Sequence, residues 1–434
     1  MSSIAILVEL MRVGTSGGHI KCWERFAESA ARLPGPVSGV PAGQRLDLTV
    51  YFLGDTERVE TLAPHVRFVM LRPVFSSAAL MSAAGAEDVT DLAPYHPRLA
   101  ALLPRHDVWH LTHSFAYAAT ATRLARRLPR RPRLVASVHT DVPALVAVYA
   151  RYLAGRWLPA ADRAPARLIA DRAARQAESR MRRRRDRLLR DCEQVLAPTA
   201  AGREDLAGTV GADRIRPLRR GLDRQRFRPD PGARARLVRD HGVPADRPLV
   251  LFAGRLDASK GVPLLTESMR LLRERGRGAH LVTAGAGTEA GAVRRTLGPD
   301  VTLLGPLPQE RLAEVYAGCD VFAFPSRTET VGNVVAEAMA SGLAVVLPEG
   351  AATTTWLAEP GHDGVLVPGD DARVWADALC ALVDQPTRLA AVRRRAAATS
   401  RDHHPTWDRV LAEDLLPAWL PTAAGHPSGT PIVA

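Results

Sequence analysis

Cysteine is scarce in this 434-residue sequence, and none of its four cysteines stands in a C-x-x-C pair. This spacing argues against a structural zinc site and is typical of a reducing compartment. No apolar run reaches the roughly 18–20 residues that a membrane-spanning helix needs. The first residues have neither the basic flank nor the small-residue cleavage site of a signal peptide, and they resemble a buried strand. We therefore expect a cytoplasmic protein. The cysteines are Cys22, Cys192, Cys319 and Cys380.

Lysine and asparagine are almost absent. Among the 58 basic residues only Lys21 and Lys260 are lysines, and Asn333 is the only asparagine. The arginine excess gives a net charge of +12 and a pI near 10.4. Such a skew is typical of an arginine-favouring coding background, so by itself it says little about nucleic acid or membrane partners. Lysine is the rarer choice in this chain, which draws attention to Lys260.

Short apolar runs alternate with helical stretches along most of the chain, which is the pattern of βα units and parallel sheets. The length allows two domains of about 200 residues each. We expect an α/β protein with two facing, doubly wound Rossmann-like domains and an active site in the cleft between them, at the carboxyl ends of the strands. The predicted strands lie within 4–9, 46–53, 66–71, 108–112, 134–140 and 195–198, and within 249–254, 279–285, 301–305, 321–325, 344–347 and 364–367.

A basic, proline-punctuated stretch at 216–231 is the predicted linker between the domains. We expect an N-terminal, acceptor-side domain over 1–215 and a C-terminal, donor-binding domain over 232–400. A helix within 401–420 has apolar spacing that favours packing back towards the N-terminal domain, and 421–434 is a tail.

One stretch departs from this alternation. Between Val142 and Asp191 the sequence is helix-like and ends in an arginine run, Arg180–Arg187. The run is either a solvated helix face or a docking surface for anionic lipid at the inner membrane surface, where each basic residue contributes about 1 kcal/mol. Nucleic acid is the least favoured partner, because few aromatics lie among the arginines and no known binding module is present.

The strongest functional signal is the stretch 324–346. It contains the end of a strand, a polar turn and a helix that begins near Gly332, whose first N–H groups favour an anion such as a diphosphate. Glu329 lies in the turn and Glu337 two helical turns later, so the two carboxylates can reach different parts of one extended ligand. The alternative interpretation makes Glu329 a helix-start acid and Glu337 a surface residue.

A second signal is the loop Gly254-Arg-Leu-Asp-Ala-Ser-Lys260, which joins the first strand of the second domain to its first helix. Arg255 and Lys260 project from this loop, and together a guanidinium and an ammonium group neutralise a diphosphate leaving group. A glycine pair, Gly17 and Gly18, follows the first strand of the chain and allows backbone amides to approach a phosphate closely. Taken alone, such a glycine loop is a weak signal.

These residues resemble the motifs of the retaining glycosyltransferases of the GT-B fold, family 4 (group 1). The resemblance covers nearly the whole chain and is densest over 196–379. It rests on Arg220-Gly-Leu-Asp at the hinge, on the Gly-Arg-Leu-x-x-x-Lys loop, on the Glu-x7-Glu motif and on Gly361-His-Asp-Gly-Val-Leu-Val-Pro-Gly-Asp370. The Glu-Thr-Val-Gly-Asn variant, together with Ser137-Val-His-Thr-Asp, is most similar to members that make glycolipids, the sulfoquinovosyl and lipid mannosyl transferases.

The resemblance also implies a role for each site residue. Arg255 and Lys260 would bind the donor diphosphate, and Glu337 would hold the nucleotide ribose. Glu329 would sit beside the donor sugar to orient it and stabilise charge, and His139 would face the same sugar. Glu329, Arg255, Lys260 and His139 thus form the implied catalytic set. Further donor contacts are implied for Gly17, Gly18, Gly305, Leu307, Val331, Gly332 and Asn333.

The predicted activity is transfer of a sugar from a nucleotide diphosphate sugar, UDP- or GDP-linked, to an acceptor hydroxyl of a lipid or glycan with retention of configuration. The resemblance implies no metal or other cofactor, and the sequence has no Asp-x-Asp motif. The alternatives are a non-catalytic nucleotide-sugar-binding or membrane-docking protein and a sugar-nucleotide epimerase of the same fold. Both predict loss of part of the motif set that is present here. One loop departs from the family pattern, since Gly350-Ala-Ala-Thr-Thr-Thr stands where Gly-Gly-x-x-Glu is common.

Overall fold

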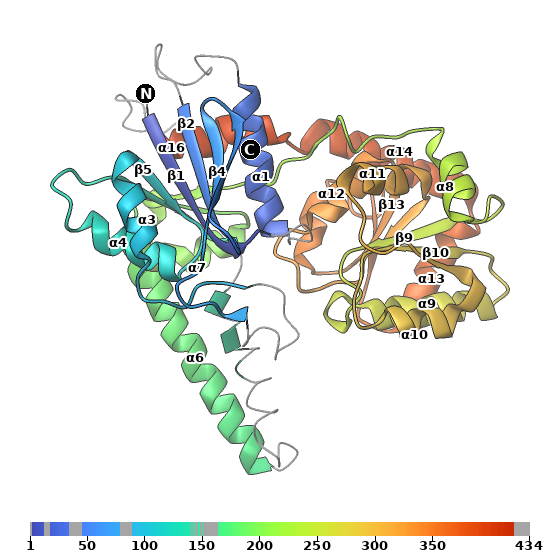
Figure 1. The fold of residues 1–434 in the computed structure, drawn as a ribbon. Coiled ribbons are helices and arrows are strands. Elements are labelled where there is room, and N and C mark those ends of the chain that lie inside the picture. Colours follow the sequence, from blue (N-terminus) through green and yellow to red (C-terminus); the bar gives the residue numbers. More distant parts are fainter. Residues whose placement is uncertain are drawn as a thin grey trace, which may run out of the picture. The chain divides into compact units, whose positions relative to one another are not determined.

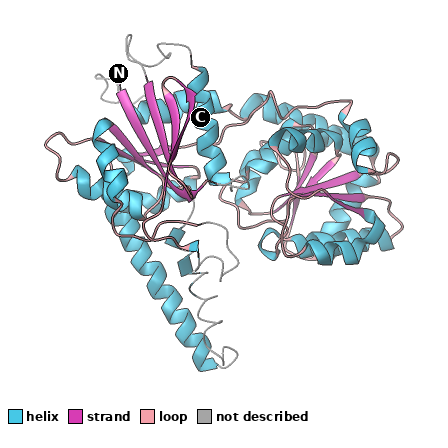
Figure 2. Ribbon diagram, viewed as in Figure 1, coloured by secondary structure: helices cyan, strands magenta, loops and turns pink. Residues whose placement is uncertain are grey.

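The chain divides into two compact units, each a mainly or wholly parallel sheet with helices on both faces (Figure 1, Figure 2). The computed structural model describes residues 2–12, 18–33, 46–78, 89–139, 142–143, 146–147, 150 and 164–420. The first unit comprises the described residues of Met1–Arg219 and Trp407–Ala434, and the second is Arg220–Thr406. The predicted α/β class with two Rossmann-like sheets is confirmed.

Within its described residues, the first unit has an eight-stranded sheet in the order β3-β4-β2-β1-β5-β6-β7-β8. The β3–β4 pair is antiparallel, and the other neighbours run parallel. The order reverses between β1 and β5, where doubly wound sheets bind ligands. The strands are β1 (Ser2–Met11), β2 (Leu46–Leu53), β3 (Arg58–Ala63), β4 (Val66–Leu71), β5 (Val108–Leu111), β6 (Arg133–Ser137), β7 (Gln194–Ala197) and β8 (Ile215–Pro217). The helices are α1 (Gly18–Arg32), α3 (Pro97–Leu102), α4 (Ala116–Ala125), α6 (Ala164–Arg190), α7 (Ala200–Val210), α15 (Trp407–Val410) and α16 (Leu416–Trp419).

Both faces of this sheet are covered, so its central strand β1 is apolar along most of its length. Ile4, Ile6 and Val8 belong to a core that includes α1 and the C-terminal helices. Ala5 and Leu7 point the other way, into a core that includes α4, α6 and α7. All five are fully buried, as expected for a parallel strand between two helical layers.

The C-terminal helical segment, α15 to α16, covers one face of the first sheet. Trp407 packs edge-on against Phe26 of α1, with ring centroids 4.9 Å apart, and Trp419 is buried. Asp414 anchors the middle of the segment. It accepts a hydrogen bond from the backbone N–H of Arg219 at 2.8 Å and pairs with the Arg219 guanidinium at 2.5 Å. The first core is therefore completed by residues from the far end of the chain.

The second unit has a six-stranded sheet in the order β11-β10-β9-β12-β13-β14, the order of the dinucleotide-binding fold. Every neighbouring pair is parallel. The strands are β9 (Leu249–Ala253), β10 (His280–Ala284), β11 (Val301–Leu303), β12 (Val321–Ala323), β13 (Ala344–Pro348) and β14 (Val365–Val367). The helices are α8 (Ala233–His241), α9 (Val262–Glu274), α10 (Ala290–Leu297), α11 (Gln309–Gly318), α12 (Asn333–Ala340), α13 (Ala372–Val383) and α14 (Pro386–His403). Helices α9, α10 and α13 cover one face, and α11, α12 and α14 cover the other (Figure 1).

Two strands and one boundary differ from the sequence-based expectation. Strand β3 is a half-exposed edge strand with charged residues, and β8 has only three residues, so neither has the apolar run that predicts a strand. The stretch 216–231, expected as a linker, contributes to both units instead. Its first two residues, Arg216 and Pro217, belong to β8. Leu222 and Phe227 are 3% exposed and lie in the core of the second unit.

Glu9, near the end of β1, is a fully buried carboxylate that caps a helix. Its two oxygens accept hydrogen bonds from the backbone N–H groups of Phe115, Tyr117 and Ala118, at 3.3, 3.0 and 2.9 Å. These amides begin α4, which has no side-chain cap of its own. Burial nevertheless raises the pKa of Glu9 to about 7, although the backbone hydrogen bonds and Arg184 act in the opposite direction.

The raised pKa makes stability depend on pH in a predictable direction. A carboxyl group that holds its proton more tightly when folded stabilises the native state at low pH, and this contribution is lost as the pH rises from about 4.5 to 7. In Glu9→Gln this contribution is absent. The unfolding free energy of Glu9→Gln relative to wild type should therefore rise by about 2.5 kcal/mol between pH 5 and 8, as measured by urea denaturation. Glu204→Gln, at an exposed position of α7, is the control. Parallel curves for wild type and Glu9→Gln would contradict the prediction.

Candidate functional site

Two loops meet at the carboxyl edge of the second sheet, where the strand order reverses between β9 and β12. Lys260 ends the loop after β9, and Thr328 and Glu329 lie in the loop after β12. The Lys260 Nζ atom is 2.6 Å from Glu329 Oε1 and 3.3 Å from Thr328 Oγ1. Both charged side chains are largely buried, with 15% and 25% of their surfaces exposed. The structure therefore brings together two of the predicted site residues and adds Thr328, which the sequence motif did not single out.

The loop after β9 is shaped to present Lys260. A 3-10 turn (Ala258–Lys260) is capped by Asp257, whose side chain accepts from the Lys260 N–H at 3.1 Å. Gly261 follows with φ +74°, and a Cβ atom there would lie 2.8 Å from the carbonyl oxygen of Pro325. Only glycine permits both this backbone conformation and this close approach of the two loops. Arg255, by contrast, is 54% exposed, and its Nε atom lies 3.6 Å from Asp257.

The loop after β12 is held at both ends. Near its start, the Arg327 guanidinium donates to the Glu349 carbonyl oxygen and pairs with Asp370, both at 2.8 Å. Near its end, the indole N–H of Trp356 donates to the Val331 carbonyl oxygen at 2.8 Å. These contacts fix the approach to α12, which begins at Asn333.

The first turn of α12 offers amides for an anion. Gly332 is its N-cap residue, with φ +67°, and no side chain caps the helix. Val331 and Asn333 flank this glycine and are partly buried. A helix N-terminus whose amides lack a side-chain acceptor favours negative charge through its dipole and free N–H groups. This is the arrangement that the sequence predicts for a diphosphate.

Glu337, about one turn into α12, is partly buried and faces α11. There it lies beside Tyr316, a fully buried tyrosine. Burial is the larger cause of a pKa for Tyr316 well above its ordinary value, and the Glu337 carboxylate adds to it. The alternative interpretation of Glu337 as a simple surface residue therefore does not fit.

Glycines bring the neighbouring loops of this edge into contact. Gly285, after β10, donates its N–H to the Gly305 carbonyl oxygen at 2.8 Å. A Cβ atom on Gly285 would lie 1.9 Å from the carbonyl oxygen of Gly254. The loops after β9, β10 and β11 are thus packed backbone to backbone. Gly305 and Leu307 occupy the loop after β11, on the same edge as Lys260.

At the first sheet, the predicted residue His139 lies two positions beyond β6 and is 4% exposed. It packs edge-on against His19 of α1, with ring centroids 4.5 Å apart, and His19 also contacts His113 at 4.4 Å. Burial lowers the pKa of His113 to about 4, so this imidazole is neutral at physiological pH. Gly18 is the exposed first residue of α1, whereas Gly17 lies outside the described residues.

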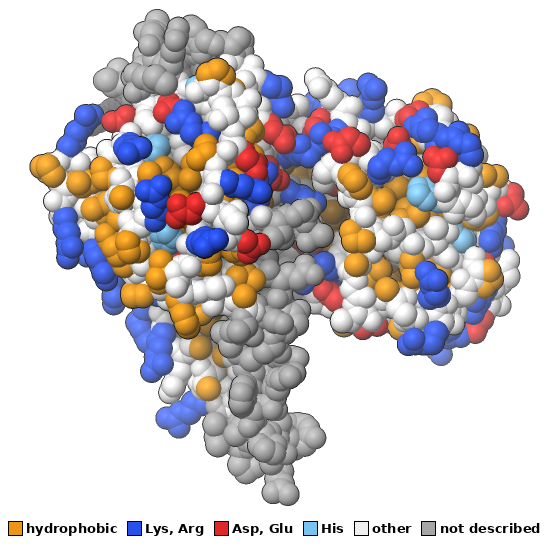
Figure 3. Space-filling view, viewed as in Figure 1, with side chains coloured by type: hydrophobic (Ala, Val, Ile, Leu, Met, Phe, Trp, Pro, Cys, Tyr) orange, Lys and Arg blue, Asp and Glu red, His pale blue; other side chains and the backbone are white. Residues whose placement is uncertain are grey.

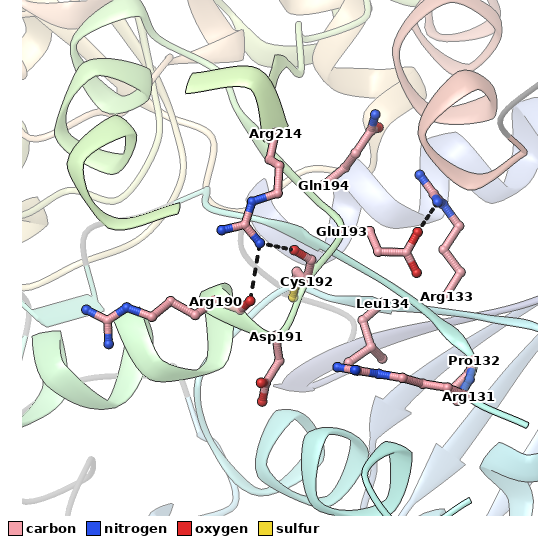
Figure 4. Close-up of a pocket in the computed structure, with 10 residues that line it drawn as sticks. All are labelled: Arg131, Pro132, Arg133, Leu134, Arg190, Asp191, Cys192, Glu193, Gln194 and Arg214. Atoms are coloured by element: carbon pink, nitrogen blue, oxygen red, sulfur yellow. Dashed lines mark hydrogen bonds and ion pairs between the residues drawn. The ribbon is translucent and has the colours of Figure 1, made fainter. Parts of the chain in front are cut away.

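A cavity of about 590 Å³ lies at the opposite, amino-terminal edge of the first sheet (Figure 4). It is lined by the residues just before and within the starts of β6 and β7. Two of its four arginines, Arg133 and Arg214, have partners within the protein. Arg214 donates to the carbonyl oxygens of Arg190 and Cys192 at 3.2 and 3.0 Å, and Arg133 pairs with Glu193. Ligands of doubly wound sheets bind at the carboxyl edge, so this cavity is not the candidate site.

Two kinds of feature are absent from the described part of the chain. In that part, no cluster of three or more His, Cys, Asp or Glu side chains is arranged to hold a metal ion. No described helix combines the length and the apolar character needed to cross a membrane.

Comparison with solved structures places the fold in the GT-B class. Sucrose-phosphate synthase from Thermosynechococcus elongatus matches with a TM-score of 0.64 and 20% identity, covering 94% of this chain and 96% of that one. WaaG, a glycosyltransferase involved in lipopolysaccharide biosynthesis, matches with a TM-score of 0.63 and 16% identity, covering 94% and 97%. At these identities the likeness shows the fold alone.

Sequence comparison defines the family of the second unit. Residues 247–385 match the family described as Glycosyl transferases group 1. The chain is 35% identical over 237 residues to the D-inositol 3-phosphate glycosyltransferase of Xylanimonas cellulosilytica, covering 51% of this chain and 56% of that protein. It is 35% identical over 209 residues to the GDP-mannose-dependent alpha-mannosyltransferase of Mycobacterium tuberculosis, covering 48% and 53%. The chain spans about half the length of these relatives. Residues 247–385 thus form a group 1 glycosyl transferase domain, which confirms the predicted group.

Sequence reasoning did not identify Thr328, Tyr316 and Trp356, which contact or support the predicted residues. Thr328 lies next to Glu329 in the motif, so proximity in sequence was the available signal. Tyr316 and Trp356 come from α11 and from the segment after β13, and no local pattern links them to the motif.

The left-handed glycine at the start of α12 gives a test of this local geometry. In Gly332→Ala the new Cβ would have an unfavourable φ and would lie 2.6 Å from Thr353 Cγ2. Gly350→Ala is the matched control, because Gly350 has φ +74° and a Cβ atom there would meet no other atom within 4 Å. Each variant should lose about 1–2 kcal/mol for the backbone conformation. Gly332→Ala should lose a further 1–3 kcal/mol, on the order expected for overpacking. Equal urea midpoints for the two variants would show that α12 does not start against Thr353.

Proposed function

We propose that this protein is a retaining glycosyltransferase that moves a sugar from a UDP- or GDP-linked donor to an acceptor hydroxyl, with no metal ion. The observation that carries the proposal is the meeting of Lys260 and Glu329 beside the uncapped N-terminus of α12. The Lys260 ammonium group and the free amides of α12 suit a diphosphate, and the Glu329 carboxylate suits a sugar hydroxyl. All three lie at one reversal of strand order, so together they suit a nucleotide diphosphate sugar. The group 1 match of residues 247–385 supports the same proposal.

In the proposed site, the donor diphosphate replaces Glu329 as the partner of Lys260. Lys260 is charge-paired with Glu329 in the free protein. When a diphosphate binds at the amides of Gly332 and Asn333, the ammonium group turns to the phosphate oxygens and Glu329 is released to a sugar hydroxyl. The half-exposed Arg255 adds a second positive charge on the leaving group. Glu337 holds the ribose, and Gly305 and Leu307 line the base.

Retention of configuration allows either attack on the front face of the anomeric carbon or a glycosyl-enzyme intermediate, and we propose the front-face attack. The acceptor hydroxyl oxygen attacks the anomeric carbon on the face from which the diphosphate leaves, and the bond from that carbon to the diphosphate oxygen breaks. The departing oxygen takes the acceptor proton, so no separate base is required. Lys260 and Arg255 stabilise the negative charge that develops on the diphosphate. For His139, Gly17 and Gly18 of the first unit, the roles that the resemblance implies beside the donor sugar and phosphate stay predictions.

The acceptor is proposed to be a hydroxyl on a lipid head group or a glycan. The glycolipid-like motif variant favours a lipid, and the two relatives are named for inositol phosphate and for GDP-mannose. A second candidate function, a nucleotide-sugar epimerase or a non-catalytic binding protein, gives no role in group transfer to the Lys260–Glu329 ion pair or to the positive charge of Arg255. It stays an outcome of the test below.

The test combines donor screening with a variant of the diphosphate clamp. Wild-type protein should be stabilised in a thermal-shift screen by one nucleotide sugar, by about 2.7 kcal/mol at one hundred times the dissociation constant. With that donor, Lys260→Ala and Arg255→Ala should each lower turnover about 10²-fold or more, because both charges act on the leaving group. Arg295→Ala, an exposed position on α10, is the control and should keep wild-type turnover. Donor binding without sugar transfer to any acceptor would favour the binding-protein alternative. Conversion of the donor sugar to its epimer would favour the epimerase.

The arginines of α6 support a further part of the proposal, a membrane partner, but only part of the run Arg180–Arg187 takes part in it. Arg185 is 6% exposed and pairs with Asp186 and Asp205, and Arg184 donates to the Phe115 carbonyl oxygen at 3.2 Å. Interpreting the whole run as solvated, or the whole run as lipid-facing, is therefore wrong.

An exposed basic stripe remains on the same helix. At 100° per residue, its six arginines fall within about 140° around the helix axis. Basic side chains are visible along the part of α6 that Figure 3 exposes. We propose that this basic stripe docks on anionic lipid, because several cations on one face add their attraction to such a surface. The stripe consists of Arg172, Arg175, Arg180, Arg183, Arg187 and Arg190.

Liposome co-sedimentation tests the basic stripe. Arg180→Gln/Arg183→Gln/Arg187→Gln should sediment less than wild type with vesicles containing anionic lipid at low salt. The difference should shrink at physiological salt, where exposed charges are screened over about 8 Å. The control, Arg295→Gln/Arg388→Gln/Arg394→Gln, removes the same charge from exposed positions of the second unit. Equal sedimentation of the two triple variants would leave the stripe as a solvated helix face.

A further inference from the structure

A line of buried hydrogen bonds connects the C-terminal helical segment to His139. The indole N–H of Trp419 donates to His110 Nδ1 at 2.8 Å. On the other side of that imidazole, His110 Nε2 is 2.8 Å from Ser137 Oγ. Ser137 Oγ is in turn 2.7 Å from His139 Nε2. All four side chains are less than 5% exposed, so water does not compete for these contacts.

The indole N–H of Trp419, at the start of the line, sets the direction of the hydrogen bonds that follow. An indole N–H can only donate, so His110 Nδ1 must be an acceptor without a proton. Burial lowers the pKa of His110 to about 3, so this imidazole is neutral and carries its one proton on Nε2. That proton is donated to Ser137 Oγ. The Ser137 hydroxyl then directs its own proton to His139 Nε2, which is left as an acceptor.

We propose that Trp419, acting through His110 and Ser137, holds His139 as the neutral Nδ1–H tautomer and so makes Nδ1 its hydrogen-bond donor. Trp419, His110 and Ser137 are positioning residues in this proposal. A proton on His139 Nε2 would point at Ser137 Oγ, which already accepts from His110, and would leave the serine proton without its acceptor. Each buried polar group left unpaired in this way costs about 1–3 kcal/mol, so the line favours one tautomer strongly.

The neighbours of His139 fit a ring that is held in one orientation. Trp23 of α1 packs edge-on against both His110 and His139, with ring centroids 4.9 and 5.5 Å apart. His19 packs edge-on against His139 from the same helix. The aromatic contacts restrict rotation of the two imidazoles, and the hydrogen bonds decide which nitrogen carries the proton. The consequence for catalysis rests on the proposed function, in which the Nδ1–H group of His139 donates to a hydroxyl of the donor sugar.

The direct test is nitrogen NMR of the full-length, ligand-free protein with 15N-labelled histidine. Long-range proton–nitrogen correlations distinguish the Nδ1–H and Nε2–H tautomers, and the spectrum of His139→Gln assigns the His139 signals. Wild type should show Nδ1–H at His139. Ser137→Ala and Trp419→Phe should shift His139 towards the Nε2–H form. Ser137→Thr keeps the hydroxyl and should restore the wild-type tautomer.

Trp407→Phe is the matched control, because Trp407 lies in the same C-terminal segment and packs on Phe26 outside the hydrogen-bonded line. It should leave the tautomer unchanged. An Nε2–H tautomer in wild type, or an unchanged Nδ1–H tautomer in Trp419→Phe, would overturn the proposal. With the donor identified, kcat/KM of Trp419→Phe should fall about threefold to tenfold relative to Trp407→Phe, the range for one hydrogen bond. If the protein transfers no sugar, the proposed function fails, while the tautomer is still decided by the spectra.

Discussion

The reversal of strand order between β9 and β12 is the constraint on which the candidate donor site depends. Within each half of this sheet, β9 to β11 and β12 to β14, successive strands are added in one direction, and the two halves run in opposite directions. At the reversal the two loops leave the strands towards opposite faces, so their starts lie side by side with open space above them. Lys260 and Glu329 come from these two loops and meet at 2.6 Å. These residues are 69 positions apart in sequence. They form an ion pair because β9 and β12 are neighbours in the sheet and their loops start at the same edge.

Close backbone packing fixes the loops that surround the candidate donor site. Gly261 and Gly285 allow carbonyl oxygens of neighbouring loops to approach within distances that a Cβ atom would occupy. Arg327 and Trp356 hold the β12 loop from two further segments. The loop can therefore keep the N-terminus of α12 uncapped, since its geometry is set from outside and not by a capping side chain of its own. An uncapped N-terminus that is rigid is prepared for an anion before the anion arrives.

The first unit depends on a different long-range contact, the return of the C-terminal segment to its sheet. Trp407 and Trp419 complete the core above α1, and Asp414 ties the segment to Arg219. The same segment supplies the indole N–H that begins the hydrogen-bonded line to His139. Packing and polar chemistry are joined here, because a buried indole needs an acceptor and a buried imidazole can accept at only one nitrogen when it is neutral.

The sequence by itself determined the α/β class, the twofold repetition of Rossmann-like units, most strands and the group 1 motifs. These follow from local signals: apolar runs, glycines at βα turns, and the spacing of Glu329 and Glu337 within one turn and helix. It did not reveal β3 or β8, which lack a buried apolar run, nor the pairing of Arg185 with Asp205. Only the tertiary structure decided that Lys260 contacts Glu329, that Glu337 faces Tyr316, and that Trp419 reaches His110. Each of these joins residues on different elements, and such contacts depend on strand order and helix packing, which no local pattern encodes.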